Sequence, residues 1–466
     1  MSTLEDTIAA IATPVGDAGI AVIRISGPRA IEICDQRFRG KRPLSGVATQ
    51  TAHYGDFENR NGERIDEVVA TIFRGPHSFT AEDVVEIGCH GGSYVTKTVL
   101  AALVESGARH AEPGEFTKRA FLNGRIDLSQ AEAVADLIHA RSRLSHQASI
   151  QQLSGRISQQ IQRLRKSILD ISSLLELELD FTEEGIDLLK KEDLLGGLTQ
   201  IISSIQQLIN SYERGRIVRD GVKVVLAGRP NVGKSSILNS LLNYDRAIVS
   251  EVPGTTRDTL EENISIGGLL FSITDTAGLR DSFDKIEEMG VERAKKELQS
   301  ADVILLVMDS SSRYLPEDFR LVRECELEAK KLGGRLLILE NKIDLPDANN
   351  ENQEWSWLNG VTRIRLSAKT GQSIEQLRSN LLECAQGSER SFEAGSAIIT
   401  SQRHRECLSR AKTFLETALV QGEKGTSPEL IADNLNLSTK ALGEIIGEVT
   451  SDDVLNNIFS HFCIGK

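Results

Sequence analysis

A phosphate-binding loop is the clearest chemical signature in this chain. Residues 228–235 read GRPNVGKS, which matches the pattern G-x-x-x-x-G-K-[ST] directly after the apolar run 222–227. In such a loop backbone N–H groups surround the phosphates, Lys234 reaches the β- and γ-oxygens, and Ser235 ligates Mg²⁺. A helix expected at 236–242 completes the context, so the segment predicts a nucleotide site rather than a chance glycine-rich turn. The expected loop contacts come from Asn231, Val232, Gly233, Lys234, Ser235 and Ser236.

Two later segments supply the groups expected around the γ-phosphate. Asp275-Thr-Ala-Gly278 follows the strand expected at 269–274. Its carboxylate is expected to anchor the Mg²⁺ shell, and the N–H of its glycine can meet the γ-phosphate. Between this motif and the loop lies Gly254-Thr-Thr-Arg-Asp258, in which Thr256 is the expected Mg²⁺ ligand when nucleotide is bound.

The base-recognition motif indicates guanine. Asn341-Lys-Ile-Asp344 follows a strand expected at 336–339. A carboxylate at Asp344 can accept hydrogen bonds from both N1–H and N2–H₂ of guanine, and adenine lacks this pair of donors. The contacts to the base are expected from Asn341, Lys342, Asp344, Ser367, Ala368 and Lys369. Together, these motifs in this order predict a GTPase.

The position after the second phosphate motif changes the expected mechanism of hydrolysis. Ras-like GTPases use a glutamine there to orient the attacking water, whereas this chain has Leu279, which cannot hydrogen-bond water. Another group must therefore act, with Arg280, Asp281, Glu287 and Glu288 as candidates. The alternative for the two glutamates is that they are solvated helix charges.

Asn231 is the second unusual residue of the loop. Its side-chain carbonyl can help to hold a monovalent cation beside the phosphates, where a cation would replace an arginine finger. The alternative is that Asn231 only packs within the loop.

The charge and cysteine content bound the other classes of function. The 466 residues carry 54 Lys and Arg against 67 Asp and Glu, a net charge of −13, so any RNA contact needs a local basic patch or a partner. The six cysteines include no C-x-x-C pair, which disfavours a zinc cage. We find no signal-peptide pattern and no apolar run of about 18 residues, and we expect a cytoplasmic protein.

The elements that must position these residues change character along the chain. Strand patterns at 20–25, 65–73 and 84–89 indicate a mixed α/β region over 1–122. Ser129-Gln-Ala-Glu132 has the pattern of a capping box, and apolar residues from Ile150 to Leu175 predict one long helix.

The central α/β region has helical segments on both sides. We expect helical segments over 123–219 and 386–466 around an α/β region at 220–385. These segments are either separate domains in a row or one helical domain with an insertion. We favour the insertion because each helical half alone has little to pack against.

Charged residues within apolar strands of the first region, and the C-terminal tail, are further candidates. Arg24 and Glu86 interrupt apolar strands and need either a ligand or neutralising neighbours, and Arg125 also stands out. Cys463 lies near the C-terminus, where a thiol could serve a site elsewhere or simply be buried. The last residues, CIGK, are a poor match to a prenylation signal.

Across its whole length the chain resembles the MnmE (TrmE) family of tRNA-modification GTPases. The resemblance rests on Ala12-Thr-Pro14, Ile23-Arg-Ile-Ser-Gly27, Ser78-Phe-Thr80, His90-Gly-Gly92, Pro113-Gly-Glu-Phe-Thr117, Arg119-Ala-Phe-Leu-Asn-Gly124, Asp127-Leu-Ser-Gln-Ala-Glu132, Gly228 to Ser235, Gly254-Thr-Thr-Arg-Asp258, Asp275-Thr-Ala-Gly-Leu-Arg280 and Cys463-Ile-Gly-Lys466. Other GTPases share the central motifs, but only this family joins them to this front region and tail.

The resemblance implies a multidomain α/β plus all-α fold. It implies an N-terminal α+β tetrahydrofolate-binding domain that dimerises, a helical bundle, and a Ras-like P-loop GTPase domain inserted in that bundle. It also implies a homodimer, potassium-dependent pairing of the GTPase domains, and a complex with the FAD-containing partner MnmG. Together the partners are expected to place an aminomethyl or carboxymethylaminomethyl group on C5 of a wobble uridine in certain tRNAs, with a folate such as 5-formyl- or methylene-tetrahydrofolate as donor.

The resemblance also implies roles for single residues. The folate-contact positions are Arg24, Glu86, Arg125 and Lys466, of which Arg125 is Lys in some members of the family. The potassium positions are Asn231, Ser250, Val252 and Thr255. The wider nucleotide and metal set adds Glu251, Pro253, Gly254, Thr256, Thr276, Ala277 and Gly278. Lys234, Arg280 and Glu287 are expected to assist hydrolysis, with Glu287 orienting water, and Cys463 matches the tail cysteine of the family.

Two rival functions are open from the sequence. A ribosome-assembly GTPase would share the central motifs but would carry a basic RNA-binding appendage. A GTP-dependent scaffold without catalysis would show no turnover when potassium replaces sodium.

Overall fold

A computed structural model describes residues 6–14, 16–180, 190–244, 261–275, 296–347, 361–386, 398–460, 462 and 464–465. The chain forms two compact units. The first contains residues 1–135, 152–203 and 407–466, and the second contains 136–151 and 204–406. None of the helices in the described ranges is both long and apolar enough to cross a membrane.

The N-terminal part of the first unit is built on a seven-stranded sheet in the order β3-β4-β5-β6-β2-β1-β7. Its strands are β1 (Ile8–Ile11), β2 (Ala18–Ser26), β3 (Phe38–Gly40), β4 (Thr51–Glu58), β5 (Arg64–Phe73), β6 (Val84–Gly91) and β7 (Arg109–His110). All neighbours are antiparallel except β1 and β7. The strands expected at 20–25, 65–73 and 84–89 are therefore confirmed as β2, β5 and β6.

Three helices accompany this sheet. They are α1 (Ala30–Asp35), α2 (Ser93–Glu105) and α3 (Glu115–Leu122). Apolar residues of α1 and α2 pack on the sheet because alternate residues of β2 and β6 present buried Ile and Val side chains to them. The core of this part is thus a two-layer sandwich of sheet and helix.

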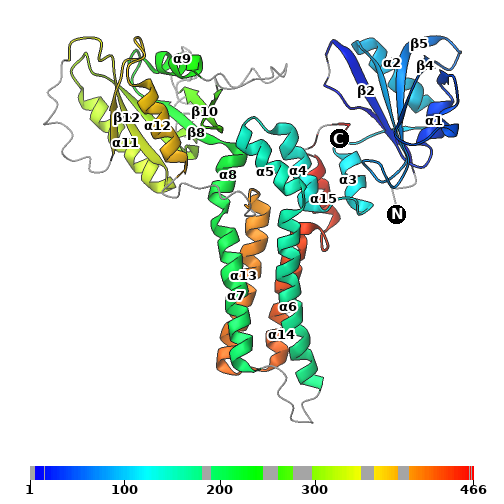
Figure 1. The fold of residues 1–466 in the computed structure, drawn as a ribbon. Coiled ribbons are helices and arrows are strands. Elements are labelled where there is room, and N and C mark those ends of the chain that lie inside the picture. Colours follow the sequence, from blue (N-terminus) through cyan, green and yellow to red (C-terminus); the bar gives the residue numbers. More distant parts are fainter. Residues whose placement is uncertain are drawn as a thin grey trace, which may run out of the picture. The chain divides into compact units, whose positions relative to one another are not determined.

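A further set of helices comprises α4 (Leu128–His139), α5 (Arg143–Leu153), α6 (Arg156–Asp180), α7 (Lys191–Asn210), α8 (Tyr212–Asp220), α13 (Gln402–Lys424), α14 (Pro428–Ile446) and α15 (Asp452–Ser460). The four long helices among them are α6, α7, α13 and α14. Within the first unit α6 and α14 lie side by side (Figure 1). Arg165 on α6 donates to the carbonyl of Thr439 at 3.3 Å and pairs with Glu448, so segments from both sides of the central region form one bundle.

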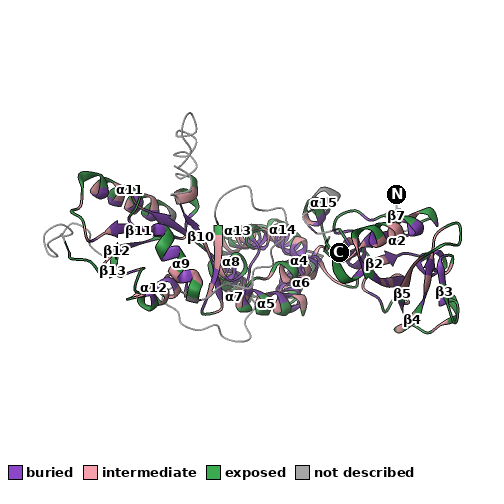
Figure 2. Cartoon of the chain, turned by 90° about the horizontal axis from the view of Figure 1, so that it is seen from above, coloured by how far each residue is buried: buried purple, intermediate pink, exposed green. Residues whose placement is uncertain are grey.

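The second unit contains a six-stranded sheet in the order β13-β12-β11-β8-β10-β9. The elements are β8 (Val222–Ala227), α9 (Lys234–Tyr244), β9 (Glu261–Ile266), β10 (Leu269–Asp275), β11 (Val303–Asp309), α11 (Pro316–Leu332), β12 (Arg335–Asn341), β13 (Thr362–Arg365) and α12 (Ile374–Gln386). All pairs are parallel except β9 with β10. The central strands are buried on both faces, as Figure 2 shows for β11, which explains their unbroken apolar runs. Because loops at the carboxyl ends of parallel strands share one edge, this topology brings the nucleotide motifs together.

Two local expectations are wrong. The capping box is formed by Asp127 and Gln130: the side-chain oxygen of each residue accepts a hydrogen bond from the backbone N–H of the other at 2.9 Å, and Ser129 lies inside α4. The predicted long helix through Ile150 is broken at Gly155, which has φ +80°, and Ile150 is exposed on α5. Glycine adopts a left-handed backbone without steric cost, and the apolar spacing alone did not reveal this break.

Candidate functional site

The phosphate loop connects β8 to α9. Gly228 has φ +143°, and a Cβ there would lie 2.5 Å from the carbonyl oxygen of Val307 on the neighbouring strand β11. Only glycine allows this close approach of loop and strand. The helix then begins at Lys234, so the N-terminal N–H groups of α9 face the loop.

Lys234 is buried within the loop that it belongs to. Its Nζ donates to the carbonyl oxygens of Gly228 and Arg229 at 2.9 and 2.8 Å. These oxygens hold the ammonium group at the centre of the loop, where β- and γ-phosphate oxygens of a nucleotide would compete for the same donors.

Asn341 connects the loop to the base-recognition motif. Its Nδ2 donates to the carbonyl of Val232 at 2.9 Å, and its Oδ1 accepts from the backbone N–H of Ala368 at 3.0 Å. One buried amide therefore fixes three of the predicted segments relative to one another.

The side chain of Asp344 is held by the third motif. The hydroxyl of Ser367 donates to its Oδ1 at 2.7 Å, and the same hydroxyl oxygen accepts from the N–H of Thr370 at 3.2 Å. One carboxylate oxygen is thus oriented by the protein, while the pair of oxygens can still accept from two donors of a base.

Lys342 holds the phosphate loop through a hydrogen bond to its backbone. Its Nζ donates to the carbonyl of Asn231 at 2.9 Å and pairs with Asp309 at 2.6 Å. Burial by itself would raise the pKa of Asp309, but hydrogen bonds from Lys342 and Ser311 outweigh it and hold the pKa below its usual value. Sequence reasoning did not identify Asp309, although its place at the end of β11 beside the phosphate loop was a usable signal.

These segments surround a cavity of about 510 Å³. It is lined by Gly233, Ser236, Asn239, Ser240, Asn243, Asn341, Lys342, Asp344, Leu345, Ala368 and Lys369. Ser240 was also missed from the sequence, and its hydroxyl donates to the carbonyl of Ala368 at 2.7 Å. The cavity has the size and polar lining expected for a nucleoside.

Ser235 and Asp275 have the chemistry of a magnesium shell. The hydroxyl of Ser235 donates to Oδ2 of Asp275 at 3.1 Å, which brings a hydroxyl and a carboxylate to the phosphate end of the loop. Oxygen ligands of this kind fit Mg²⁺, which binds proteins through few side chains and keeps water or phosphate oxygens. In the ranges that the structure describes, no group of three or more His, Cys, Asp or Glu residues could hold a metal by itself.

The exposed side chain of Asn231 suits the cation role predicted for it. Asn231 has φ +64°, a conformation that asparagine tolerates better than most residues. Its backbone carbonyl is engaged by Lys342, whereas its side chain has no hydrogen-bond partner among the described residues.

The remaining predicted residues of the nucleotide and tail sites lie outside the described residues. They are Ser250, Glu251, Val252, Pro253, Gly254, Thr255, Thr256, Thr276, Ala277, Gly278, Arg280, Asp281, Glu287, Glu288, Cys463 and Lys466.

Arg24 and Glu86 lie opposite each other on β2 and β6. The guanidinium pairs with Oε1 of Glu86 at 2.7 Å, which is the neutralisation by a neighbour that the sequence left as the alternative to a ligand. The rings of Phe79 and Phe116 lie 5.3 and 5.7 Å from the guanidinium carbon, and Nη1 donates to the carbonyl of Gly465 at 3.4 Å. The structure therefore brings the C-terminal tail to Arg24.

Arg125 is not part of this arrangement in the described residues. It follows α3, is exposed, and has no hydrogen bond or ion pair to Arg24 or Glu86 there.

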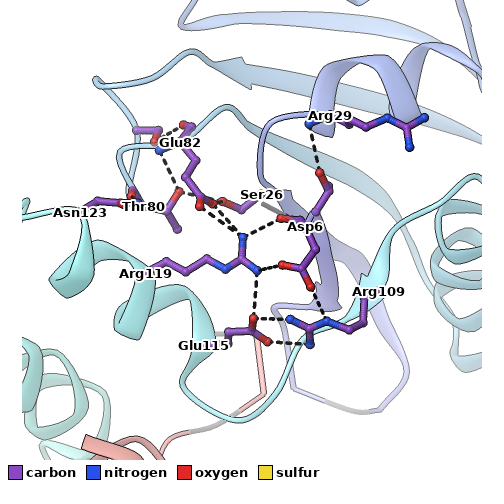
Figure 3. Close-up of polar contacts among 11 residues, drawn as sticks. Asp6, Ser26, Arg29, Thr80, Glu82, Arg109, Glu115, Arg119 and Asn123 are labelled. Carbon is purple, nitrogen blue, oxygen red and sulfur yellow. Dashed lines mark hydrogen bonds and ion pairs between the residues drawn. The ribbon is translucent and has the colours of Figure 1, made fainter. Parts of the chain in front are cut away.

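Arg119 is the buried centre of an ion network in the N-terminal part of the first unit (Figure 3). Arg119, which is 2% exposed, pairs with Asp6, Glu82 and Glu115. Arg109 bridges the carboxylates of Asp6 and Glu115 at 2.6 Å each. The network ties α3, the segment before β1 and the loop before β6 together, and so fixes the backbone that carries both rings.

Two family models match adjoining parts of the chain. The model of the GTP-binding protein TrmE N-terminus matches residues 7–125, and that of the MnmE helical domain matches residues 128–463.

Full-length relatives show the same similarity. The chain is 43% identical to the tRNA modification GTPase MnmE of Cytophaga hutchinsonii, over 99% of this chain and 98% of that protein. It is 41% identical to the protein of the same name from Carboxydothermus hydrogenoformans, over 99% and 100% of the two chains. Among solved structures, the G domain of the FeoB iron transporter of T. maritima matches 35% of this chain and 99% of that chain, with 27% identity and a TM-score of 0.27.

Proposed function

The chain belongs to the MnmE family of tRNA modification GTPases, and from this premise we propose how its GTP hydrolysis is used. With an FAD-containing partner, MnmG, it would support addition of an aminomethyl or carboxymethylaminomethyl group to C5 of the wobble uridine of certain tRNAs. A reduced folate, such as the 5-formyl or methylene form, would supply the one-carbon unit. Because the substrate would be tRNA, the chain would work in the cytoplasm.

One observation carries the nucleotide assignment. The carboxylate of Asp344, held by Ser367, and the amide of Asn341 border the same cavity as Gly233. Asp344 would accept from N1–H and N2–H₂ of guanine, and Ala368 and Lys369 would close on the base. Lys234 would transfer its donors from the loop carbonyls to the β- and γ-phosphates as they enter the loop.

Two metal ions would complete the site. Ser235 and Thr256 would ligate Mg²⁺ with Asp275 behind them, and bound Mg²⁺ would neutralise charge on the β- and γ-phosphate oxygens. Asn231, Ser250, Val252 and Thr255 would hold K⁺, whose charge would stand in for an arginine finger.

Water activation would fall to residues other than a glutamine. Glu287 would orient the attacking water and Arg280 would assist, because Leu279 cannot do so. Paired GTPase domains of two copies would enclose this site, and their opening and closing would be driven by hydrolysis.

The folate donor would bind at the N-terminal domain, for which we propose residues 1–122. Arg24, Glu86, Arg125 and Lys466 would contact it, and Cys463 would lie on the tail that Gly465 holds at Arg24. The helical domain would comprise 123–219 and 386–466, with the GTPase domain over 220–385 inserted between them.

Hydrolysis in two salts tests the proposal. At equal ionic strength we expect GTP turnover to be at least about 10-fold faster in KCl than in NaCl, since removing one transition-state charge contact costs about that much or more. Asn231→Ala should lose most of the difference while nucleotide binding, measured by fluorescence titration, stays near that of the wild type.

Equal low rates in the two salts would contradict the potassium site. No turnover in either salt would favour the scaffold alternative. Turnover without modification of tRNA in the presence of the partner would favour the ribosome-assembly alternative.

A further inference from the structure

A basic stretch interrupts this acidic chain. Residues 137–169 contain no Asp or Glu but six Arg and Lys, whereas the whole chain has a net charge of −13. Its longest continuous helical part is the first half of α6, in the first unit. Such a local reversal of sign is what an acidic protein needs in order to approach a polyanion.

Three basic side chains of α6 point away from the bundle. Arg156, Arg163 and Lys166 are exposed and have neither a hydrogen bond nor an ion pair from their side chains in the described part of the chain. Their spacing of seven and three residues places them on one face of the helix. By contrast Arg165, on a different face, is engaged by α14 through Thr439 and Glu448.

Another face of the same helix is apolar and packs within the first unit, so the three basic side chains remain exposed to solvent. Ile157, Ile161, Leu164 and Ile168 are buried in the first unit at one side of α6. Around the helix axis, the basic residues are roughly a third of a turn or more from this line of apolar residues. Gln159 and Ser167 are exposed on the same side of the helix as the basic residues. We call Arg156, Arg163 and Lys166 the α6 stripe; it extends about 15 Å along the helix axis and ends before the exposed Asp170.

We propose that the α6 stripe binds the phosphate backbone of tRNA. This inference rests on the proposed function, because tRNA is the polyanion that the family modifies. Unpaired guanidinium and ammonium groups neutralise phosphates and release counterions, and the neighbouring Gln159 and Ser167 can donate hydrogen bonds to phosphate or ribose oxygens.

The composition of α6 also indicates that the α6 stripe does not recognise bases. The helix carries no aromatic residue between Arg156 and Asp180, so it offers no platform on which a base could stack. The stripe therefore contacts backbone rather than bases, and it positions tRNA without choosing its sequence. Recognition of the wobble base belongs elsewhere in the complex.

The test is the salt dependence of tRNA binding by the full chain. The variant R156Q/R163Q/K166Q removes the three charges but keeps polar side chains on the exposed face. We expect its affinity for an unmodified tRNA transcript to fall about 10-fold or more at 100 mM KCl. The slope of log K against log[KCl] should shrink by about 2, since each phosphate contact contributes roughly 0.7–0.9. Fluorescence anisotropy with end-labelled tRNA measures both quantities.

A matched control distinguishes the effect of the α6 stripe from the effect of removing three positive charges elsewhere. K97Q/K424Q/K440Q removes three other exposed and unpaired lysines of the first unit and should leave affinity and slope within about 2-fold of the wild type. Circular dichroism should show the same helix content for all three proteins. GTP turnover in KCl without tRNA should be the same for all three proteins. The tRNA affinity therefore tests the α6 stripe, and the GTP turnover tests the GTPase assignment independently.

Three outcomes would overturn the stripe as a tRNA surface. The first is a wild-type chain that binds no tRNA even at 50 mM KCl. The second is an R156Q/R163Q/K166Q variant with unchanged affinity and slope. The third is a variant that keeps tRNA affinity but loses binding to the FAD-containing partner in a pull-down, which would assign the surface to a protein. None of the three would affect the proposed GTP site.

Discussion

At the scale of single residues, Gly233 joins the phosphate loop to the base-recognition motif. Its φ is +102°, and a Cβ at this position would lie 2.2 Å from Nδ2 of Asn341. The glycine therefore serves two purposes: it turns the loop toward the phosphates, and it leaves room for the amide that holds Val232 and Ala368. At such positions the nucleotide site has no room for even one additional atom, so we expect single side chains to control its specificity.

Asp344→Asn tests the assignment of the base. Loss of the carboxylate removes a charge-assisted pair of hydrogen bonds, worth about 1.5–3 kcal/mol, so the affinity for GTP should fall about 10- to 100-fold. The affinity for ATP should stay as weak as before. Titration of both nucleotides by calorimetry measures the difference.

The control for this variant is Asp347→Asn, which makes the same chemical change at an exposed ion pair with Arg365. It should leave both affinities unchanged. If Asp344→Asn bound GTP as tightly as the wild type, Asp344 would not read guanine.

At the scale of elements, the ion network around Arg119 sets the position of α3 against the sheet. Burial would raise the pKa values of Asp6 and Glu115, but hydrogen bonds from Arg109 and Arg119 outweigh it and lower both. The rings of Phe116 on α3 and Phe79 near Glu82 then both lie close to the guanidinium of Arg24, at 5.7 and 5.3 Å. A buried network that leaves one charge unpaired is costly, so α3 depends on all of its members.

Arg119→Met should destabilise the first unit. Removing one member of a buried ion pair costs about 3–5 kcal/mol in the free energy of unfolding. In the wild type, lowered native pKa values mean that stabilisation by Asp6 and Glu115 is present above their usual values of 3.8 and 4.5 and is lost as the pH falls through the native values. The variant should show a weaker loss of stability between about pH 5 and pH 3, measured by urea unfolding.

Arg29→Met is the matched control, since Arg29 forms an exposed pair with Glu32 on the same domain. It should leave the unfolding free energy at pH 7 nearly unchanged. An Arg119→Met protein with the acid dependence of the wild type would show that the network does not stabilise the native state.

At the scale of the whole molecule, the chain leaves the first unit and returns to it. Residues 204–406 belong to the second unit, whereas α6 before them and α14 after them pack together. Domain insertion of this kind requires that the ends of the inserted part can be joined to a continuous core. The stability of the first unit should therefore depend on residues from both sides of the second.

Leu435→Ala, at a fully buried position of α14, tests this dependence. Truncation of a buried leucine costs about 2–5 kcal/mol. Scanning calorimetry should show two transitions, of which Leu435→Ala lowers only one. Saturating GTP with Mg²⁺ should raise only the other, because ligand binding stabilises the unit that binds it.

Leu437→Ala on the same helix provides the control, because Leu437 is 43% exposed and should shift neither transition appreciably. A single transition that both Leu435→Ala and GTP displace would contradict independent unfolding of the two units.

The sequence by itself determined the class of nucleotide chemistry and several strands of the fold. Residues 228–235, 341–344 and 367–369 could be predicted as nucleotide contacts because loop conformation and hydrogen-bonding groups depend on local spacing. The strands β2, β5 and β6 followed from runs of apolar and β-branched residues for the same local reason. The insertion of the α/β region was favoured because each helical half alone has little to pack against, and the family resemblance implied the same arrangement.

Only the tertiary structure decided which distant residues meet. The pairing of Lys342 with Asp309, the hydroxyl of Ser240 on Ala368, and the carbonyl of Gly465 on Arg24 join segments far apart in the chain. Such contacts depend on strand order and on the path of the tail, which no local spacing records. The capping box at Asp127 and the break at Gly155 were misjudged because competing local patterns are resolved by packing and backbone geometry, not by residue type alone.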